Sequence, residues 1–189
     1  WGACSCGSLT PPASGNPPLL EEHTPKGLGN HCAIITEQNL PLMERFKDYL
    51  ESVGFVGYSN FDIKYDERDQ SWRAFEINLR LGRSNNYVTS AGCNVAKYIV
   101  DDYIKNAKYD GTYFCDREIF WHSVPKGVIY KYCRNADEVA HAKSLAREGK
   151  AHPSLWYRPD LILNPRRLFY LILHGRNHYG KFKKYYGKE

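Results

Sequence analysis

Two neighbouring stretches of the chain alternate apolar and polar residues with a period of two. They are residues 60–66, Asn-Phe-Asp-Ile-Lys-Tyr-Asp, and residues 75–80, Phe-Glu-Ile-Asn-Leu-Arg. This alternation is typical of half-buried strands, and the polar residues 67–70 between them suit a hairpin loop. One face of the hairpin is therefore expected to be apolar, with Phe61, Ile63, Tyr65, Phe75, Ile77, Leu79 and Leu81.

The opposite face of the expected hairpin is polar. The first strand contributes Asn60, Asp62 and Lys64, and the second contributes Glu76, Asn78 and Arg80. If the hairpin closes symmetrically on its loop, Asp62 faces Glu76 and Asn60 faces Asn78. Directly opposed side chains begin about 5 Å apart, so the two carboxylates should repel each other. A divalent cation with oxygen ligands would relieve that repulsion.

Apolar residues at spacings of three and four predict helices elsewhere. Met43, Phe46, Leu50 and Val53 form one such stripe, and Gly54 follows it where a helix often ends. Further helices are predicted over 94–106, over 136–148 and from 164–165 onward. Short strands are expected at 19–22, 113–115, 119–121 and 128–132, and a loop at 23–30. Together these elements indicate an α+β protein, with an antiparallel sheet backed by helices and a helical C-terminal tail.

Length and composition limit the class of protein. The 189 residues, 42% of them hydrophobic, suffice for one domain with a core, or one and a half. No apolar run approaches the roughly 20 residues of a membrane span, and no secretory signal is visible. Because the chain begins with Trp1 and not Met, we expect that its upstream part is missing. We also expect a cytoplasmic protein. We expect a disordered or remnant segment at 1–18, the main domain at 19–107 and an α+β extension at 108–189.

Charge, cysteines and histidines add little chemistry by themselves. The net charge of +5 is mild, and the basic residues near the end form either a solvated helical face or a surface for an anionic partner. No base-reading motif supports nucleic acid as that partner. The six cysteines lack paired metal-binding spacing, which favours reduced thiols. Five histidines are expected to serve packing or the surface: His122, His141, His152, His174 and His178.

The order of segments resembles the C-terminal half of an ATP-grasp domain. The matching stretches are Leu-Glu-Glu-His-Thr-Pro at 20–25, Gly-Phe-Val-Gly-Tyr-Ser-Asn-Phe-Asp at 54–62 and Glu-Ile-Asn-Leu-Arg at 76–80. The match covers residues 19–105. Within that superfamily, the sequences of segments 21–27, 62–69 and 76–84 are similar to those of carboxylate–amine ligases of bacterial cell-wall synthesis, of the D-aspartate ligase type. Those enzymes attach an amino acid to a lysine side chain of a peptidoglycan precursor.

The resemblance implies a reaction and roles for particular residues. ATP would phosphorylate a carboxylate and an amine would attack the acyl phosphate, releasing ADP and phosphate. Asp62 and Glu76 would hold one Mg²⁺, and Glu76 with Asn78 a second, with Mn²⁺ as a possible substitute. Arg80 would contact a phosphoryl or acyl-phosphate oxygen. Four further residues are expected to bind nucleotide or substrate: Glu22, Lys64, Arg83 and Asn85.

Several alternatives stay open at this point. The polar face could be a solvent-facing salt-bridge network, and the loop after Arg80 could be an ordinary polar loop. The chain could also be an inactive ATP-grasp remnant or binding module. Another ATP-grasp reaction, of the carbamoyl-phosphate-synthase or biotin-carboxylase kind, is a third reading. Residues 1–18 contain no glycine-rich flap or phosphate-binding lysines, so we expect the chain alone to bind ATP weakly.

Overall fold

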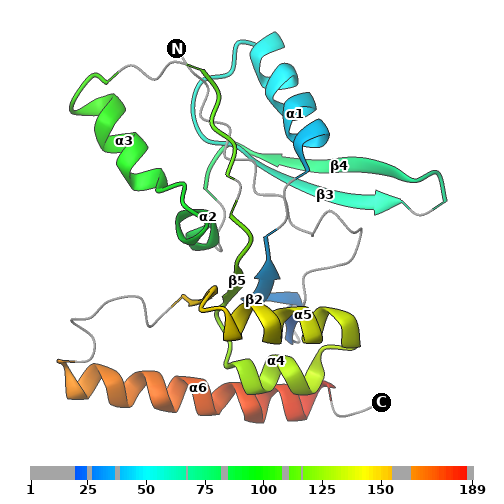
Figure 1. Ribbon diagram of the computed structural model, residues 1–189, viewed down its shortest axis with the longest axis vertical. Coiled ribbons are helices and arrows are strands. Elements are labelled where there is room, and N and C mark those ends of the chain that lie inside the picture. Colours follow the sequence, from blue (N-terminus) through cyan, green and yellow to red (C-terminus); the bar gives the residue numbers. More distant parts are fainter. Residues whose placement is uncertain are drawn as a thin grey trace. The chain divides into compact units, whose positions relative to one another are not determined.

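The computed structural model describes residues 20–24, 27–36, 39–66, 68–81, 85–107, 111–115, 117–154 and 163–186. Among these, the side chains of 20–24, 27–32 and Lys64 are not described. The described chain divides into two compact units (Figure 1). The first comprises residues 36–118, and the second combines residues 20–35 with 119–186. The expected division at 107/108 stays a prediction about the ATP-grasp-like part.

The first unit contains the hairpin and the helix that covers it. Strand β3 (Asn60–Asp66) pairs antiparallel with β4 (Ser71–Asn78), and α1 (Leu40–Ser52) packs on the hairpin's apolar face (Figure 1). Asn39 caps α1 by accepting a hydrogen bond from the Leu42 backbone N–H. Phe61 is only 1% exposed and stacks on Phe46 at 4.2 Å between ring centroids. Burying such a ring contributes about 1.5–3 kcal/mol.

The hairpin contains a β-bulge that alternation did not predict. Asp62 pairs with Glu76, but the next residue, Ile63, pairs with Ala74, so Phe75 is the extra residue. Phe75 is 70% exposed, and its expected place on the apolar face is therefore wrong. Beyond the bulge, Trp72 packs against the core beneath α1 instead. The sequence contained a sign of this bulge, because the apolar residues Trp72 and Phe75 are an odd number of positions apart and cannot share one face of a regular strand.

Two further helices complete the first unit. The short helix α2 (Asn86–Ser90) was not predicted, and α3 (Val95–Tyr103) follows it. Asn94 caps α3 through the Lys97 backbone N–H. Residues 113–115, expected as a strand, form no regular element.

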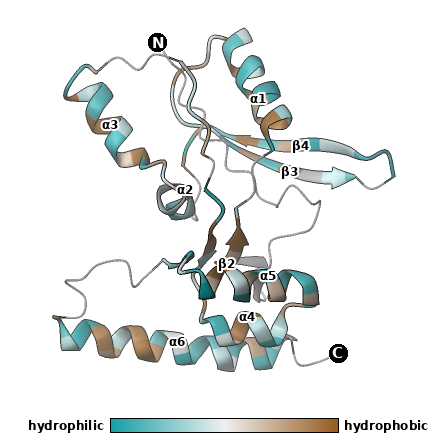
Figure 2. Ribbon diagram, viewed as in Figure 1, coloured by the Kyte–Doolittle hydropathy of each residue, from teal (hydrophilic) through white to brown (hydrophobic). Residues whose placement is uncertain are grey.

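The second unit is built on a four-stranded sheet in the order β1-β2-β5-β6. These strands are Leu20–Thr24, Gly27–Ile35, Phe120–His122 and Ala151–Pro153. The first three pair antiparallel, and β6 lies parallel to β5. Because β2 begins at Gly27, the expected loop over 23–30 is wrong: its two ends belong to a hairpin. The apolar end of β2 is visible in Figure 2.

Three helices belong to this unit: α4 (Lys126–Tyr132), α5 (Ala136–Arg147) and α6 (Pro165–Tyr186). The expected strand at 128–132 is in fact α4. Val128 and Ile129 are buried in the core with Phe120, Leu145 and Phe182. A helix buries these adjacent apolar residues and still satisfies its own backbone, so packing overrides their β-propensity. The α+β class is confirmed. In the described part of the chain, no helix combines the length and apolar character needed to cross a membrane.

Candidate functional site

The polar face of the β3–β4 hairpin has the register expected from the sequence. Asn60 pairs with Asn78, and Asp62 pairs with Glu76. The bulge at Phe75 produces this register, because the pairing next to the loop, if continued without it, would place Asp62 opposite Phe75. Since α1 covers the opposite face, this polar face can contact ligands and solvent.

Asp62 is held by two amide side chains. Asn60 Nδ2 donates to Asp62 Oδ1 at 3.2 Å, and Asn78 Nδ2 donates to Asp62 Oδ2 at 3.4 Å. Burial, and then the facing charge of Glu76, raise the pKa of Asp62, while the Asn60 hydrogen bond and Arg80 oppose that rise. A positive charge would therefore stabilise the ionised Asp62 carboxylate, and Arg80 provides only part of that stabilisation.

Asn60 is a site residue to which sequence reasoning gave no role. It is 7% exposed, and its Oδ1 has no hydrogen-bond partner in the described part of the chain. The neighbouring Ser59 Oγ is also buried and unpartnered there. Buried polar atoms without partners are uncommon and call for an explanation. The signal in the sequence was the facing pair Asn60–Asn78, in which two amides border one carboxylate.

The donor set fits a hard divalent cation. Asp62 and Glu76 offer carboxylate oxygens, and Asn78 and Asn60 offer amide oxygens if their amides turn. An amide turn exchanges oxygen and nitrogen, which have nearly the same shape. Among the described residues, no group of three or more His, Cys, Asp or Glu side chains is placed to hold a metal. A metal here would therefore rely on amide oxygens, water and ligand oxygens besides the two carboxylates.

The salt-bridge alternative involves two cations, Lys64 and Arg80, and of these only the Arg80 side chain is described. Neither Asp62 nor Glu76 forms an ion pair with Arg80, and Arg80 Nη1 donates to the Leu81 carbonyl at 3.4 Å. The ion pairs among the described side chains of this hairpin lie near its loop, where Asp66 contacts Arg68 and Arg73. The guanidinium of Arg80 is thus exposed beside the carboxylate pair.

Of the remaining residues predicted to bind nucleotide or substrate, only Asn85 has a described side chain. Glu22 lies on β1 and Lys64 on β3, with their side chains outside the described set, and Arg83 lies outside the described residues. Asn85 is described and lies in the first unit, just before α2. It is 8% exposed, and neither side-chain Oδ1 nor Nδ2 has a partner in the described part of the chain. A buried amide with both ends unsatisfied is suited to a polar ligand or ordered water.

Comparison with known proteins bears on the resemblance. No family model matches the chain, and no solved structure matches it. A D-aspartate ligase from Enterococcus faecium (strain Aus0004) is 34% identical over 173 residues. That alignment covers 89% of this chain but 41% of the ligase, so the chain spans about two fifths of the length of this curated relative. The similarity to a ligase of the D-aspartate ligase type, expected from the motifs at 20–25, 54–62 and 76–80, is confirmed.

Proposed function

We propose that this chain is the C-terminal part of an ATP-dependent carboxylate–amine ligase. The enzyme would activate an amino-acid carboxylate as an acyl phosphate and join it to an amine, forming a C–N bond with release of ADP and phosphate. D-aspartate is the proposed amino-acid substrate, in line with the name of the relative. A peptidoglycan precursor is the proposed amine acceptor, as the family resemblance implies. The cytoplasm, where such precursors are made, is the proposed location.

The observation that carries this proposal is the pairing of Asp62 with Glu76, bordered by Asn60 and Asn78. Bound Mg²⁺ would supply neutralisation of the charge on the triphosphate and on the phosphoryl group in transfer. Asp62, Glu76 and Asn78 would hold it, and Asn60 Oδ1 is a further oxygen at the same face. The raised pKa of Asp62 supports this role, because a cation would stabilise its ionised form.

The other residues take roles that follow from their chemistry. Arg80 continues the metal face, and its exposed guanidinium would contact a phosphoryl or acyl-phosphate oxygen through two parallel N–H groups. Asn85 and Arg83 would hold the carboxylate of the amino acid. Lys64 would contact a phosphate, and Glu22 would approach the nucleotide. These four assignments rest on the family resemblance, and for Asn85 also on its unsatisfied buried amide.

Activity is best tested in the native protein that contains this chain. ADP release is measured with Mg²⁺ and ATP, with D-aspartate and other amino acids screened as donors and a lysine-containing muropeptide as acceptor. Glu76→Gln should lower turnover by about 10²–10³-fold, since removal of one group that stabilises transition-state charge costs about that much. Glu44→Gln, on the exposed face of α1, is the matched control and should keep full activity.

The outcomes separate the candidate functions. ADP release that requires an amino acid and an amine supports the ligase. ATP turnover that requires bicarbonate instead would favour a carboxylase or carbamoyl-phosphate reaction. Full turnover in Glu76→Gln would refute the metal assignment, and no nucleotide binding at all would indicate a remnant without catalysis.

A further inference from the structure

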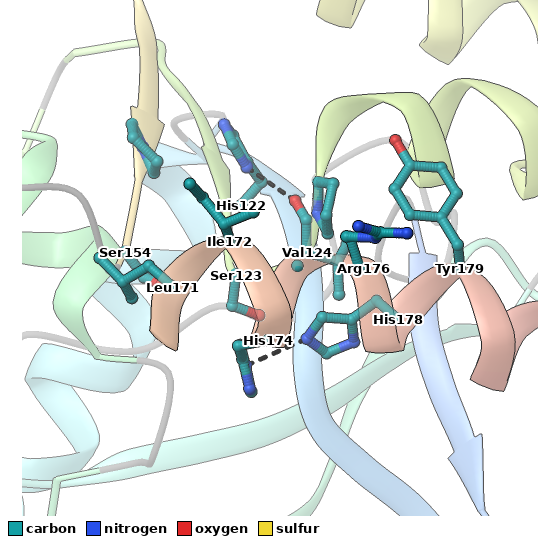
Figure 3. Close-up of a pocket in the computed structure, with 13 residues that line it drawn as sticks. His122, Ser123, Val124, Ser154, Leu171, Ile172, His174, Arg176, His178 and Tyr179 are labelled. Atoms are coloured by element: carbon teal, nitrogen blue, oxygen red, sulfur yellow. Dashed lines mark hydrogen bonds between the residues drawn. The ribbon is translucent and has the colours of Figure 1, made fainter. Parts of the chain in front are cut away.

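A second polar cluster lies in the other unit, on α6. His174 and His178 are four residues apart on this helix, so their side chains emerge on the same face one turn apart. Both line a cavity of about 270 Å³, together with the loop that follows β5 (Figure 3). The sequence analysis took these histidines as packing or surface residues.

The two imidazoles meet through their Nε2 atoms. The Nε2–Nε2 distance is 3.1 Å, and the rings lie edge to face with centroids 4.7 Å apart (Figure 3). His178 is 1% exposed, while His174 is half-buried. A contact between two ring nitrogens requires that one donates and the other accepts, so the pair contains at least one lone pair directed at its neighbour.

We propose that His174 and His178 bind one divalent transition-metal ion at the floor of this cavity. Two imidazole nitrogens bound at about 2.0–2.1 Å to one tetrahedral ion lie about 3.3 Å apart. The observed 3.1 Å is within about 0.2 Å of that separation. The ion takes the place of the shared proton, and the donor ring moves to its Nδ1–H tautomer, so no net proton is released.

The cavity leaves the ion open to a further ligand. In the described part of the chain, no third His, Cys, Asp or Glu is close enough to complete a metal cluster. His122 lines the same cavity, and its Nδ1 lies 2.8 Å from the Val124 carbonyl. Since a carbonyl accepts only, Nδ1 carries the proton and Nε2 keeps its lone pair. With Arg176 at the exposed rim, the open positions suit a small carboxylate or water.

The ligand type separates this site from the hairpin. Imidazole nitrogen favours Zn²⁺, Ni²⁺ and Cu²⁺, whereas the oxygen donors at Asp62 and Glu76 favour Mg²⁺ and Mn²⁺. The helix also distinguishes the site from a zinc peptidase. The residue after His174 is Gly175, where the His-Glu-x-x-His motif has a glutamate that acts as general base. Peptide hydrolysis is therefore not the expected activity.

The test is a Ni²⁺ titration of the 189-residue chain in excess Mg²⁺, followed by isothermal calorimetry and by paramagnetic broadening of histidine ring signals in NMR. We expect His174 and His178 to broaden first, and His174→Gln and His178→Gln each to weaken this binding at least 10-fold. His141→Gln, on the exposed face of α5, is the matched control and should leave the binding unchanged.

His178 is fully buried, so its replacement could disturb folding. The half-buried His174 therefore provides the decisive variant, with circular dichroism to verify its fold. Broadening of the pair that disappears in folded His174→Gln supports the proposal. Ni²⁺ binding of equal strength in His174→Gln, or broadening of His141 before the pair, overturns it. Because the hairpin is not involved, this result stands apart from the ligase test.

Discussion

Asp62→Asn is expected to make the metal-free protein more stable while it removes metal binding. The pKa of Asp62 is raised by burial and by Glu76, so the folded pKa lies above the unfolded one. Between the unfolded and the folded pKa, the folded state binds more protons than the unfolded state. The stability of the fold therefore falls as the pH rises from the unfolded pKa to the folded pKa. At neutral pH, above both pKa values, the ionised Asp62 carboxylate destabilises the fold to the full extent. Asparagine cannot ionise, so the Asp62→Asn protein lacks this destabilisation.

The magnitude follows from Coulomb's law. Two unit charges about 6 Å apart at an effective dielectric constant of about 40 repel by about 1.4 kcal/mol, and the exposure of Glu76 reduces this to about 0.7 kcal/mol. A gain of this size raises the melting temperature of a protein of 189 residues by about 2 °C.

The assay is thermal denaturation with EDTA and again with saturating Mg²⁺. The wild type should gain stability with Mg²⁺, by about 1.4 kcal/mol at ten times the dissociation constant, and Asp62→Asn should gain none. Asp48→Asn, at an exposed position of α1, should behave as the wild type. A lower melting temperature of Asp62→Asn in EDTA, or an equal response to Mg²⁺, would refute the electrostatic reasoning.

Three further predictions concern the fold. Gly54→Ala should destabilise the protein by about 1 kcal/mol in thermal melts, because Gly54 has φ +65°, while Gly180→Ala, at an open position of α6, should stabilise it by about 0.5–1 kcal/mol; the same sign for both would count against this. Asn135→Ala should cost about 1 kcal/mol in chemical denaturation, since its Oδ1 accepts two backbone N–H groups at the start of α5, and no loss would disprove that role. A side-chain hydrogen bond with Cys93, and then burial, raise the pKa of Cys115, so its alkylation at pH 8 should be at least about 10-fold slower in the native protein than in urea; equal rates would contradict the assignment.

Local features of the sequence predicted local features of the fold. Asn39 and Asn135 cap the helices expected after them, and Gly54 follows the end of α1 as expected, with a positive φ. Caps and apolar stripes depend on neighbours within one or two turns, so they are legible from sequence alone. The facing pairs of the hairpin were predicted from the alternation of polar residues, but the loop alone does not set them, because the bulge at Phe75 shifts the register by one residue.

Features that depend on distant contacts were not predictable. The strand β6 exists because it pairs with β5, about 30 residues earlier in the chain. The segment Val128–Ile129 has β-propensity but is a helix, since both side chains are buried in the core with Phe182 of α6.

The candidate site shows the same division. Asp62, Glu76 and Asn78 followed from alternation and resemblance. The role of Asn60 required knowledge of which of its atoms are buried and unpartnered. The pairing of His174 with His178 required the continuous helix α6, which passes through Gly175 and Gly180 without a break.

The central claim is that the Asn60–Asn78 and Asp62–Glu76 pairs form a divalent-metal site, and Mn²⁺ tests it most directly. In NMR spectra of the ¹⁵N-labelled chain, substoichiometric Mn²⁺ should broaden the amide signals of residues 60–62 and 76–78 before all others. Mg²⁺ should reverse this broadening, and Glu76→Gln should remove it. Broadening that is spread over the chain, or that persists unchanged in Glu76→Gln, would contradict the account.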